Sequence, residues 1–338
     1  MNFWQQLPTP CYVLAPMADV TDAPFRRLIA KYSAHPRADG TVGGPDVMWT
    51  EFVSADGLVR ATPEGKQKLL ADLIYTEAER PIVAQLFSAN EAHMEQAAAL
   101  CFELGFDGVD INMGCPDRSV EKQGCGAAMI KNPAQARAII RAAKRGAASD
   151  TAAGIPVSVK TRLGYNQDQV AEWIPELLAE QPAALTIHAR TRKEMSKVPA
   201  RWERLREAVG LRDTLAPETV LLGNGDALSL ADAKERVHES GADGAMLGRA
   251  IFGNPWLFHP EKDLSNVSLT ERLEVMIEHT HLFVELLPHK SFAVMKKHYK
   301  AYINGFPGAA ELRATLMEQA TPDGVEAVAR EFLAQQTH

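Results

Sequence analysis

The sequence predicts an α/β fold, a TIM-type (β/α)8 barrel followed by a small all-helical C-terminal domain. Short apolar segments alternate with segments of helical periodicity over about 250 residues, the usual length of such a barrel. Eight of these apolar segments occur, one for each strand of the barrel. Beyond residue 260 the strand-like segments stop and only helical patterns continue. We therefore place the barrel in residues 1–260 and the helical domain in residues 261–338.

The predicted strands are short runs rich in Val, Ile, Leu and Ala, bounded by turn-forming residues. A doubly wound open sheet shows the same alternation, but no GxGxxG motif follows the first strand, as a dinucleotide-binding version requires. The barrel is therefore the preferred fold. Its predicted strands are Cys11–Ala18, Val47–Val53, Ile82–Ser88, Gly108–Cys115, Val157–Leu163, Ala184–Ala189, Val220–Asn224 and Ala245–Gly248.

Helical periodicity is clearest in five of the segments between the strands. Two other segments, 34–45 and 146–154, are rich in Gly, Pro, Ala, Ser or Asp, and each lies between a helix and the next strand. In a barrel such loops lie on the face away from the active site, so we interpret both as tolerated surface insertions. The predicted helices are Ala23–Tyr32, Glu91–Leu104, Pro133–Lys144, Val170–Leu178 and Leu230–Ser240.

The C-terminal segment predicts about four helices. Ser268 with Glu271 three residues later is the signature of a capping box at a helix start. Apolar stripes at helical spacing follow it. Their members are Leu269, Leu273, Met276, Ile277, Val284, Leu287, Phe292, Met295, Tyr299, Tyr302, Leu312, Leu316, Val325, Val328 and Phe332.

Composition is that of an ordinary globular protein, with 46% hydrophobic and 23% charged residues. No run of 18 apolar residues occurs, the N-terminus lacks the layout of a signal peptide, and the four cysteines form no CxxC pair. We expect a cytoplasmic monomer with no membrane association and no metal. The net charge of −7 argues against a generally basic nucleic-acid binder but allows a local basic surface.

Polar residues or glycines stand at or near the end of most predicted strands. In a barrel these ends meet at one mouth, where reacting groups collect. Packing alone does not require apolar strands to finish in amides, cations and glycines. The endings are Pro16-Met17-Ala18, Glu51, Gln85, Asn112 with Cys115, Lys160 with Arg162, His188 with Arg190, Asn224-Gly225-Asp226 and Gly248-Arg249.

The last two strand endings predict a phosphate site. Glycines there let backbone N–H groups approach an anion, and the loops after strands seven and eight are the usual phosphate site of this barrel. Simple turn chemistry would also explain the glycines. A monophosphate cofactor fits this pattern better than a dinucleotide.

Lys160 and His188 would lie beside that cofactor. One interpretation is a Schiff-base lysine; the other is a pair of donors that stabilise negative charge on a flavin ring or an enolate-like substrate. The Gln85 amide and the Pro16–Ala18 backbone would suit hydrogen bonding to a flat heterocycle. The residues alone leave these alternatives open.

Cys115 stands between Gly114 and Pro116 where the chain leaves a strand, which favours a chemical role. The alternatives are a buried structural cysteine and a zinc site with Cys125, and the spacing and the lack of a nearby His disfavour zinc. In the tail, Lys296, Lys297 and Lys300 lie beside His298 and Tyr299. This pattern indicates either an RNA contact or a solvated helix face.

Five segments of the sequence carry distinctive motifs: Ala-Pro-Met-Ala-Asp-Val-Thr-Asp (15–22), Val-Asp-Ile-Asn-Met-Gly-Cys-Pro (109–116), Ser-Val-Lys-Thr-Arg-Leu-Gly (158–164), Thr-Ile-His-Ala-Arg-Thr-Arg (186–192) and Gly-Asn-Gly-Asp (223–226). With these motifs the sequence resembles the tRNA-dihydrouridine synthases. The resemblance runs from about residue 10 into the helical tail. It implies an FMN-containing barrel and a helical domain that holds tRNA. It also implies an oxidoreductase acting on a CH–CH group, which uses NADPH to reduce particular uridines to 5,6-dihydrouridine.

The resemblance also implies residue roles. Cys115 matches the proton donor, and Asn112 and Arg190 match positions that face the uracil. The departures from the family are the two insertions and a tail that is not basic, since residues 261–338 hold 8 Lys and Arg against 11 Asp and Glu, a balance of −3. The implied FMN contacts are Pro16, Met17, Ala18, Gln85, Lys160, His188, Asn224, Gly225, Asp226, Gly248 and Arg249.

The residue types suit that reaction. Hydride transfer from flavin N5 to uracil C6 places negative charge on C5 and on the C4 carbonyl oxygen, where Arg190, His188 or Lys160 would stabilise it. A proton must then reach C5, and a thiol with a pKa near 8.5 keeps its proton at neutral pH. The base must leave its stack to enter the mouth, which favours uridines in loops.

Two other functions fit the same residues. One is a flavin-dependent small-molecule ene or dihydropyrimidine oxidoreductase, in which the tail is only a dimer contact. The other is an RNA-binding chaperone on a barrel that has lost catalysis, although the presence of Cys115, Lys160 and His188 argues against it.

Overall fold

The structure, a computed structural model, describes residues 2–148 and 154–336. Its main sheet has eight strands in the order β1-β10-β9-β8-β7-β6-β5-β4, and all adjacent strands in that order are parallel. Each predicted strand overlaps one of them. The strands are β1 (Cys11–Leu14), β4 (Met48–Ser54), β5 (Ile82–Phe87), β6 (Gly108–Asn112), β7 (Val157–Arg162), β8 (Ala184–His188), β9 (Val220–Asn224) and β10 (Gly244–Leu247).

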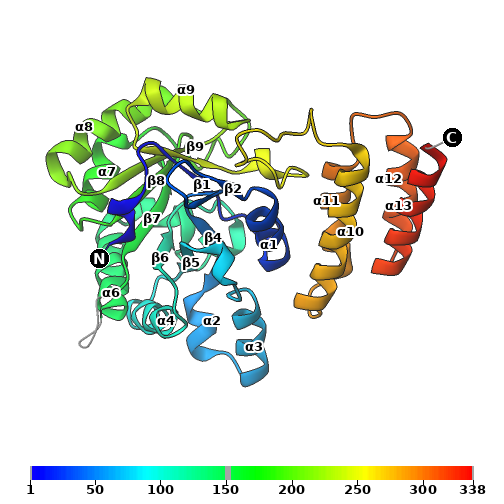
Figure 1. The fold of residues 1–338 in the computed structure, drawn as a ribbon. Helices are drawn as coiled ribbons and strands as arrows, with labels where there is room; N and C mark the ends of the chain where they lie inside the picture. The colour runs from blue at the N-terminus through cyan, green and yellow to red at the C-terminus, as the bar shows by residue number, and fades with distance from the viewer. Residues whose placement is uncertain (1, 149–153, 337–338) are drawn as a thin grey trace. The chain divides into compact units, whose positions relative to one another are not determined.

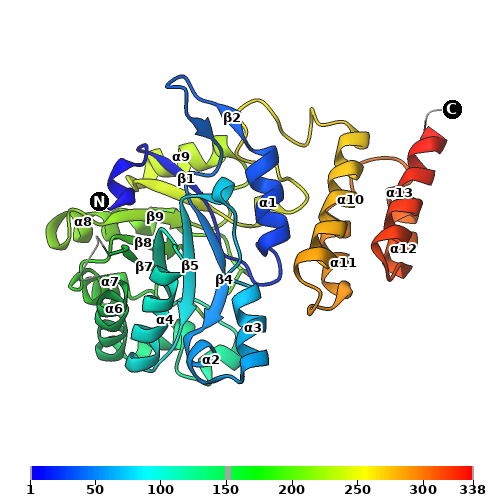
Figure 2. The same cartoon turned by 60° about the horizontal axis from the view of Figure 1, so that its bottom comes forward.

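Backbone hydrogen bonds close this sheet into a barrel. β1 and β4 stand at the two ends of the strand order. The N–H of Leu14 donates to the carbonyl of Val47 at 3.0 Å, and the N–H of Asp46 donates to the carbonyl of Tyr12 at 2.9 Å. The segment just before β4 therefore joins β1, and the predicted (β/α)8 barrel is confirmed (Figures 1 and 2).

Helices connect successive strands, as parallel pairing requires. Asn90 shows how one of them begins, because its side chain accepts the backbone N–H of His93 and caps α4. The helical segments predicted from periodicity are all helical. The helices between β4 and β10 are α2 (Ala55–Arg60), α3 (Pro63–Ala71), α4 (Glu91–Glu103), α5 (Arg118–Glu121), α6 (Pro133–Ala147), α7 (Val170–Leu178), α8 (Leu205–Leu215) and α9 (Leu230–Ser240).

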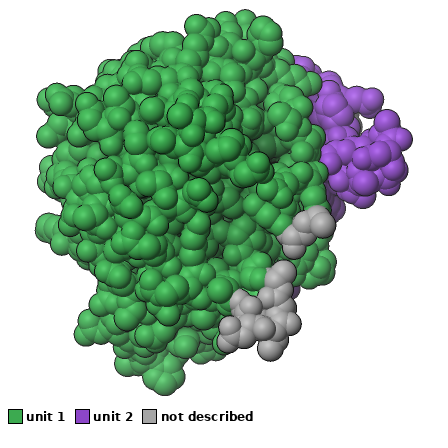
Figure 3. Space-filling view, turned by 90° about the vertical axis from the view of Figure 1, so that its left-hand side faces the viewer, with its two compact units in different colours: residues 1–17, 45–248 green, residues 18–44, 249–338 purple. Residues whose placement is uncertain are grey.

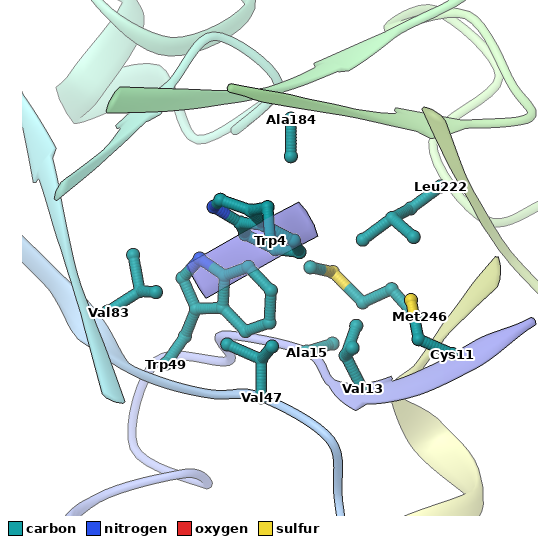
Figure 4. Close-up of a cluster of buried hydrophobic side chains, with 10 residues drawn as sticks. All are labelled: Trp4, Cys11, Val13, Ala15, Val47, Trp49, Val83, Ala184, Leu222 and Met246. Atoms are coloured by element: carbon teal, nitrogen blue, oxygen red, sulfur yellow. The ribbon is translucent and has the colours of Figure 1, made fainter. Parts of the chain in front are cut away.

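Apolar side chains fill the N-terminal part of the barrel interior. Trp4, from the short 3-10 helix Phe3–Gln6, lies among side chains of β1, β5, β8, β9 and β10 (Figure 4). Its ring centroid is 5.8 Å from that of Trp49 on β4. Both tryptophans are almost fully buried, so this end of the barrel is packed and the opposite end is where a ligand can enter.

The chain divides into two compact units, residues 1–17 with 45–248 and residues 18–44 with 249–338 (Figure 3). The first unit holds the barrel strands. The second holds the C-terminal helices that the sequence predicted, and it also includes α1 (Ala23–Tyr32) and the segment 34–44. Its other helices are α10 (Leu269–Leu286), α11 (Met295–Tyr302), α12 (Ala309–Glu318) and α13 (Pro322–Gln336).

Helix α1 packs with α10 inside the second unit. The Phe25 ring lies 4.9 Å from the ring of His279 and 5.2 Å from that of His298, measured between centroids. At the surface of this contact, Lys31 and Tyr32 both donate to the carboxylate of Glu278. Ser268 caps α10 by accepting the backbone N–H of Glu271, as its position in the sequence predicted.

The segment 34–45, predicted as an inserted loop, contains a short antiparallel ribbon of β2 (His35–Pro36) and β3 (Val42–Gly43). In the second predicted insertion, 146–154, residues 149–153 lie outside the described residues. Among the helices that the structure describes, none is both long and apolar enough to cross a membrane.

Candidate active site

The barrel interior changes from apolar to polar toward the C-terminal ends of the strands. Val83 on β5 and Leu222 on β9 belong to the apolar cluster around Trp4. Side chains two positions apart on a strand face the same side, so Gln85 and Asn224 share that interior. Both are buried amides. The strands therefore bring polar groups together at the mouth of the barrel.

The turn after β6 holds Cys115 by its backbone. Asn112, the last residue of β6, accepts the backbone N–H of Gly114 at 3.1 Å and that of Cys115 at 2.9 Å, both on Oδ1. Its Nδ2 donates to Oε1 of Gln85 at 3.0 Å. The amide of Asn112 thus links the neighbouring strand β5 to the turn and fixes where the thiol leaves the barrel wall.

The Cys115 thiol is half-buried beside a cluster of Phe87, Val120 and Cys125. Burial raises the pKa of Cys115 above its ordinary value, and the nearby charges of Arg162 and Lys160 only partly oppose this. The thiol therefore keeps its proton at neutral pH. This is the protonation state that a proton donor needs and the opposite of an activated nucleophile.

Lys160 on β7 reaches across β8 to β9. Its Nζ donates to Oδ1 of Asn224 at 3.2 Å. Nδ2 of Asn224 donates to the carbonyl of Met246 at 2.7 Å, which fixes the orientation of the amide. Burial, together with the like charge of Arg162, lowers the pKa of Lys160 to about 8. The site thus holds a cation that can lose its proton just above neutral pH.

His188, Arg190 and Asp226 form a third group. Arg190 is buried and donates from Nη1 to Nε2 of His188 at 3.0 Å, from Nη2 to the carboxylate of Asp226, and from Nε to the carbonyl of Val198 at 2.6 Å. A guanidinium can only donate, so Nε2 of His188 is an acceptor and a neutral ring carries its proton on Nδ1.

Gly225 makes the close packing of this group feasible. Its φ is +121°, a region that favours glycine. A Cβ at this position would lie 2.8 Å from the Cβ of Ala200 and 3.1 Å from Cδ2 of His188. Any side chain here would displace Ala200 or the imidazole of His188, so only glycine fits at this position.

Gly248 lies beside Met17. The register pairs Leu14 with Leu247, and a Cβ on Gly248 would be 3.5 Å from Sδ of Met17. This brings the ends of β1 and β10 together, as the sequence predicted. Ala18 and Arg249 belong to the second compact unit, and their place at the mouth stays a prediction.

Sequence reasoning named Arg162 without giving it a role. Its guanidinium is buried, and it donates to the carbonyls of Gly114 at 2.7 Å, Thr191 at 3.2 Å and Met195 at 3.1 Å. Burial lowers its pKa to about 10. Arg162 therefore holds the Cys115 turn from the carbonyl side, while Asn112 holds it from the N–H side.

Asp110 is a site residue that the sequence analysis did not identify. Its carboxylate is buried inside the barrel and accepts from Nε2 of Gln85 at 2.7 Å and from Oγ of Ser158 at 2.6 Å. Its position in the sequence could have indicated this role, because Asp110 lies two residues before Asn112 on the same strand and so faces the same interior. In the described part of the chain, no three His, Cys, Asp or Glu side chains are grouped as a metal site would need.

Comparison with known proteins places the chain in one family. The model of the dihydrouridine synthase (Dus) family matches residues 13–337. The chain is 40% identical to the protein named "Probable tRNA-dihydrouridine synthase 2" of Bacillus subtilis strain 168, over 98% of this chain and 96% of that protein. It is 38% identical to "Probable tRNA-dihydrouridine synthase" of Staphylococcus aureus strain MRSA252, over 99% and 96%. Among solved structures, the old yellow enzyme homologue of Zymomonas mobilis covers 72% of this chain and 85% of its own, with 13% identity and a TM-score of 0.44. The chain belongs to the dihydrouridine synthase family.

Proposed function

We propose that this protein reduces specific uridines of tRNA to 5,6-dihydrouridine, with FMN as cofactor and NADPH as reductant. The names of the Bacillus and Staphylococcus relatives support the substrate. One observation supports the chemistry most strongly: the turn that carries Cys115, a thiol whose pKa burial raises, is held between Asn112 and Arg162, with Lys160 close enough to influence it.

The residues at the mouth fit FMN. Lys160 and Asn224 offer a cation and an amide for the ring system, and Gly225 and Gly248 stand in the loops after β9 and β10, the usual phosphate site of this barrel. Reduced FMN, when bound, supplies the hydride that is delivered to C6 of the uracil. The proposed FMN contacts are Pro16, Met17, Ala18, Gln85, Lys160, His188, Asn224, Gly225, Asp226, Gly248 and Arg249.

Cys115 then donates its proton to C5 of the uracil. Before that transfer, negative charge develops on the C4 carbonyl, and the fixed positive charge of Arg190 stabilises it. Arg190 uses three N–H groups on His188, Asp226 and Val198, so two of its five remain to contact the uracil. Asn112 uses one Nδ2 hydrogen on Gln85 and keeps the other for the base.

We assign tRNA holding to residues 261–338, with α11 as part of the contact. Lys296 and Lys300 are exposed on α11 and Lys297 is half-buried, while Met295 and Tyr299 form its buried face. These cations offer phosphate contacts even though the segment as a whole is not basic. The target uridine must leave its stack to reach Cys115.

Anaerobic reduction assays test this function. The purified protein should be yellow, should be reduced by NADPH, and should convert uridine to dihydrouridine in tRNA taken from cells without this modification. Mass spectrometry of the digested nucleosides measures the product. Reduction of a free enone with no change in tRNA would instead favour the small-molecule oxidoreductase, and a colourless protein that only binds RNA would favour the chaperone.

A further inference from the structure

We infer that Asp110 is a positioning residue of this site, whose carboxylate sets the direction of a hydrogen-bond chain that ends on the backbone of Cys115. The chain runs through two amides, Gln85 and Asn112, that the proposed function places against the cofactor and the uracil. The inference rests on that proposed function for its catalytic consequence. Its structural part stands on the contacts alone.

This series of hydrogen bonds connects three neighbouring strands. Ser158 on β7 donates from Oγ to Oδ1 of Asp110 on β6 at 2.6 Å. Nε2 of Gln85 on β5 donates to the other carboxylate oxygen, Oδ2, at 2.7 Å. Nδ2 of Asn112 donates to Oε1 of Gln85 at 3.0 Å, and Oδ1 of Asn112 accepts the N–H of Gly114 and of Cys115.

The groups at the two ends of this hydrogen-bond series can each act in only one way, as donor or as acceptor. Backbone N–H groups can only donate, and an ionised carboxylate can only accept. The oxygen of Asn112 must therefore face the turn, its nitrogen must face Gln85, and the nitrogen of Gln85 must face Asp110. With a carboxylate at position 110, reversal of either amide would bring donor to donor or acceptor to acceptor.

Water does not offer these groups an alternative. Gln85 is fully buried, and Asp110 and Ser158 are nearly so, while Asn112 is 9% exposed. A buried polar group that loses its partner has no replacement for it. The orientation of the two amides is consequently fixed by Asp110 and by the turn, and the two ends of the chain depend on each other.

Protonation of Asp110 would remove this constraint. Burial raises its pKa to about 6, opposed by the hydrogen bonds from Gln85 and Ser158 and by the charge of Lys160 on β7. Trp49 on β4 is a further polar neighbour of this carboxyl. A protonated carboxyl can donate to Oε1 of Gln85, so the Gln85 amide is no longer held in one orientation and Asn112 loses its fixed acceptor.

Amide hydrogen exchange tests this series of hydrogen bonds without any activity measurement. In Asp110→Ala we expect the amide hydrogens of Gly114 and Cys115 to exchange about tenfold faster or more, while those of β8 are unchanged. Asp110→Asn keeps an amide oxygen for Gln85 and can turn its nitrogen to the hydroxyl of Ser158, so its exchange should stay within about threefold of the wild type.

Asp107 provides the matched control. It precedes the other end of the same strand, where its carboxylate accepts the backbone N–H of Ile82 at 2.8 Å and pairs with Arg80. Asp107→Ala should leave exchange at Gly114 and Cys115 unchanged. Equal exchange in Asp110→Ala and the wild type would overturn the inference, whether or not the protein reduces tRNA. Should Asp110→Ala not fold, the nearly isosteric Asp110→Asn still tests the inference through the pH profile of a single turnover.

The catalytic consequence is read from the pH profile of a single turnover in which tRNA reoxidises the reduced flavin. In the wild type, the first-order rate at saturating tRNA should fall as pH drops through 6, because Asp110 takes up a proton. Asp110→Asn should lose this acid limb, and Asp110→Ala should be slower by about tenfold at every pH with little change in half-saturation. A wild-type acid limb that persists in Asp110→Asn would refute the catalytic role while leaving tRNA reduction itself established.

Discussion

Nζ of Lys160 and Oδ1 of Asn224 lie 3.2 Å apart and join β7 to β9 across the intervening strand β8. The two side chains meet at the level where the barrel interior becomes polar. The carbonyl of Met246 fixes the Asn224 amide, so the amide oxygen must face the lysine. A cation in a low-dielectric mouth, with one neutral partner, is well placed to attract an anionic ligand.

FMN binding by the apoprotein should weaken as pH rises through about 8. The pKa of Lys160 is lowered to about 8, so the side chain is charged below this pH and neutral above it. Lys160→Met should bind FMN about 10- to 100-fold more weakly at pH 7, the size expected when a hydrogen bond to a charged group is removed, and its affinity should not change between pH 7 and 9. Fluorescence titration measures both.

Lys144→Met is the control for this titration. Lys144 on α6 also has a pKa lowered by burial, and it donates to the carbonyls of Glu180 and Gln181, away from the mouth. FMN affinity should be unchanged in this variant. An equal pH dependence in Lys160→Met and the wild type would assign the titration to another group.

The helical unit should lose stability in acid because two histidines are buried in it. Burial lowers the pKa of His298 to about 3 and that of His279 well below its ordinary value. Because the histidine pKa is lower in the folded state, the unfolded chain takes up protons at a higher pH than the folded chain does. Stability is therefore complete above pH 6.5 and falls progressively toward pH 3. Each histidine should cost about 2 kcal/mol of unfolding free energy at pH 5 relative to pH 8.

His298→Phe should reduce this acid loss. Its ring edge already meets Phe25, so a phenyl group suits the same environment. Denaturant unfolding at pH 5 and pH 8 gives the comparison, with the exposed His289→Phe as control in the same unit. An unchanged difference between the two pH values would show that these buried rings do not govern acid stability.

Charge reversal on α11 should weaken tRNA binding. The triple variant Lys296→Glu, Lys297→Glu, Lys300→Glu removes two exposed cations and one that lies 3.7 Å from a carboxylate oxygen of Asp19. We expect affinity at moderate salt to fall at least tenfold, and the slope of log K against log salt to shrink by roughly 0.7–0.9 for each tRNA phosphate that the protein no longer neutralises. Filter binding across salt concentrations measures both quantities.

Arg330→Glu controls for the general effect of added negative charge. Arg330 is exposed on α13 and already paired with Glu274 and Glu326. Reversing the charge of Arg330 should leave the slope of log K against log salt unchanged. Unchanged affinity in the α11 variant would move the RNA surface elsewhere.

The barrel could be predicted from the sequence because its strands are local patterns. Apolar runs bounded by turn residues mark all eight strands, and the strand ends drew attention to the residues that now lie together. The apolar stripe of α11, through Met295, Tyr299 and Tyr302, is buried as predicted. Helix α3 gave no such signal, because none of its residues is buried and so no stripe exists to be found.

The rest depends on contacts between residues far apart in the chain. Helix α1 has an ordinary amphipathic pattern, and nothing in it indicates that Phe25 packs against His279, more than 250 positions later. The strand ends also did not show that Arg190 is tied to Asp226 and His188, or that Asp110 orients Gln85. Hydrogen bonds between specific distant side chains produce no periodic pattern in the sequence, so periodicity cannot predict them.

The most direct test of the account is a single turnover of the Cys115→Ala enzyme. Anaerobic enzyme reduced with NADPH is mixed with tRNA that lacks dihydrouridine, and the product is counted by nucleoside mass spectrometry. We predict that Cys115→Ala keeps its yellow colour and its reduction by NADPH, but forms dihydrouridine at least about 100-fold more slowly, as expected when a general acid is removed. Cys101→Ala, which removes a buried thiol within α4, should remain near the wild-type rate. Product formation by Cys115→Ala at the wild-type rate would contradict the account.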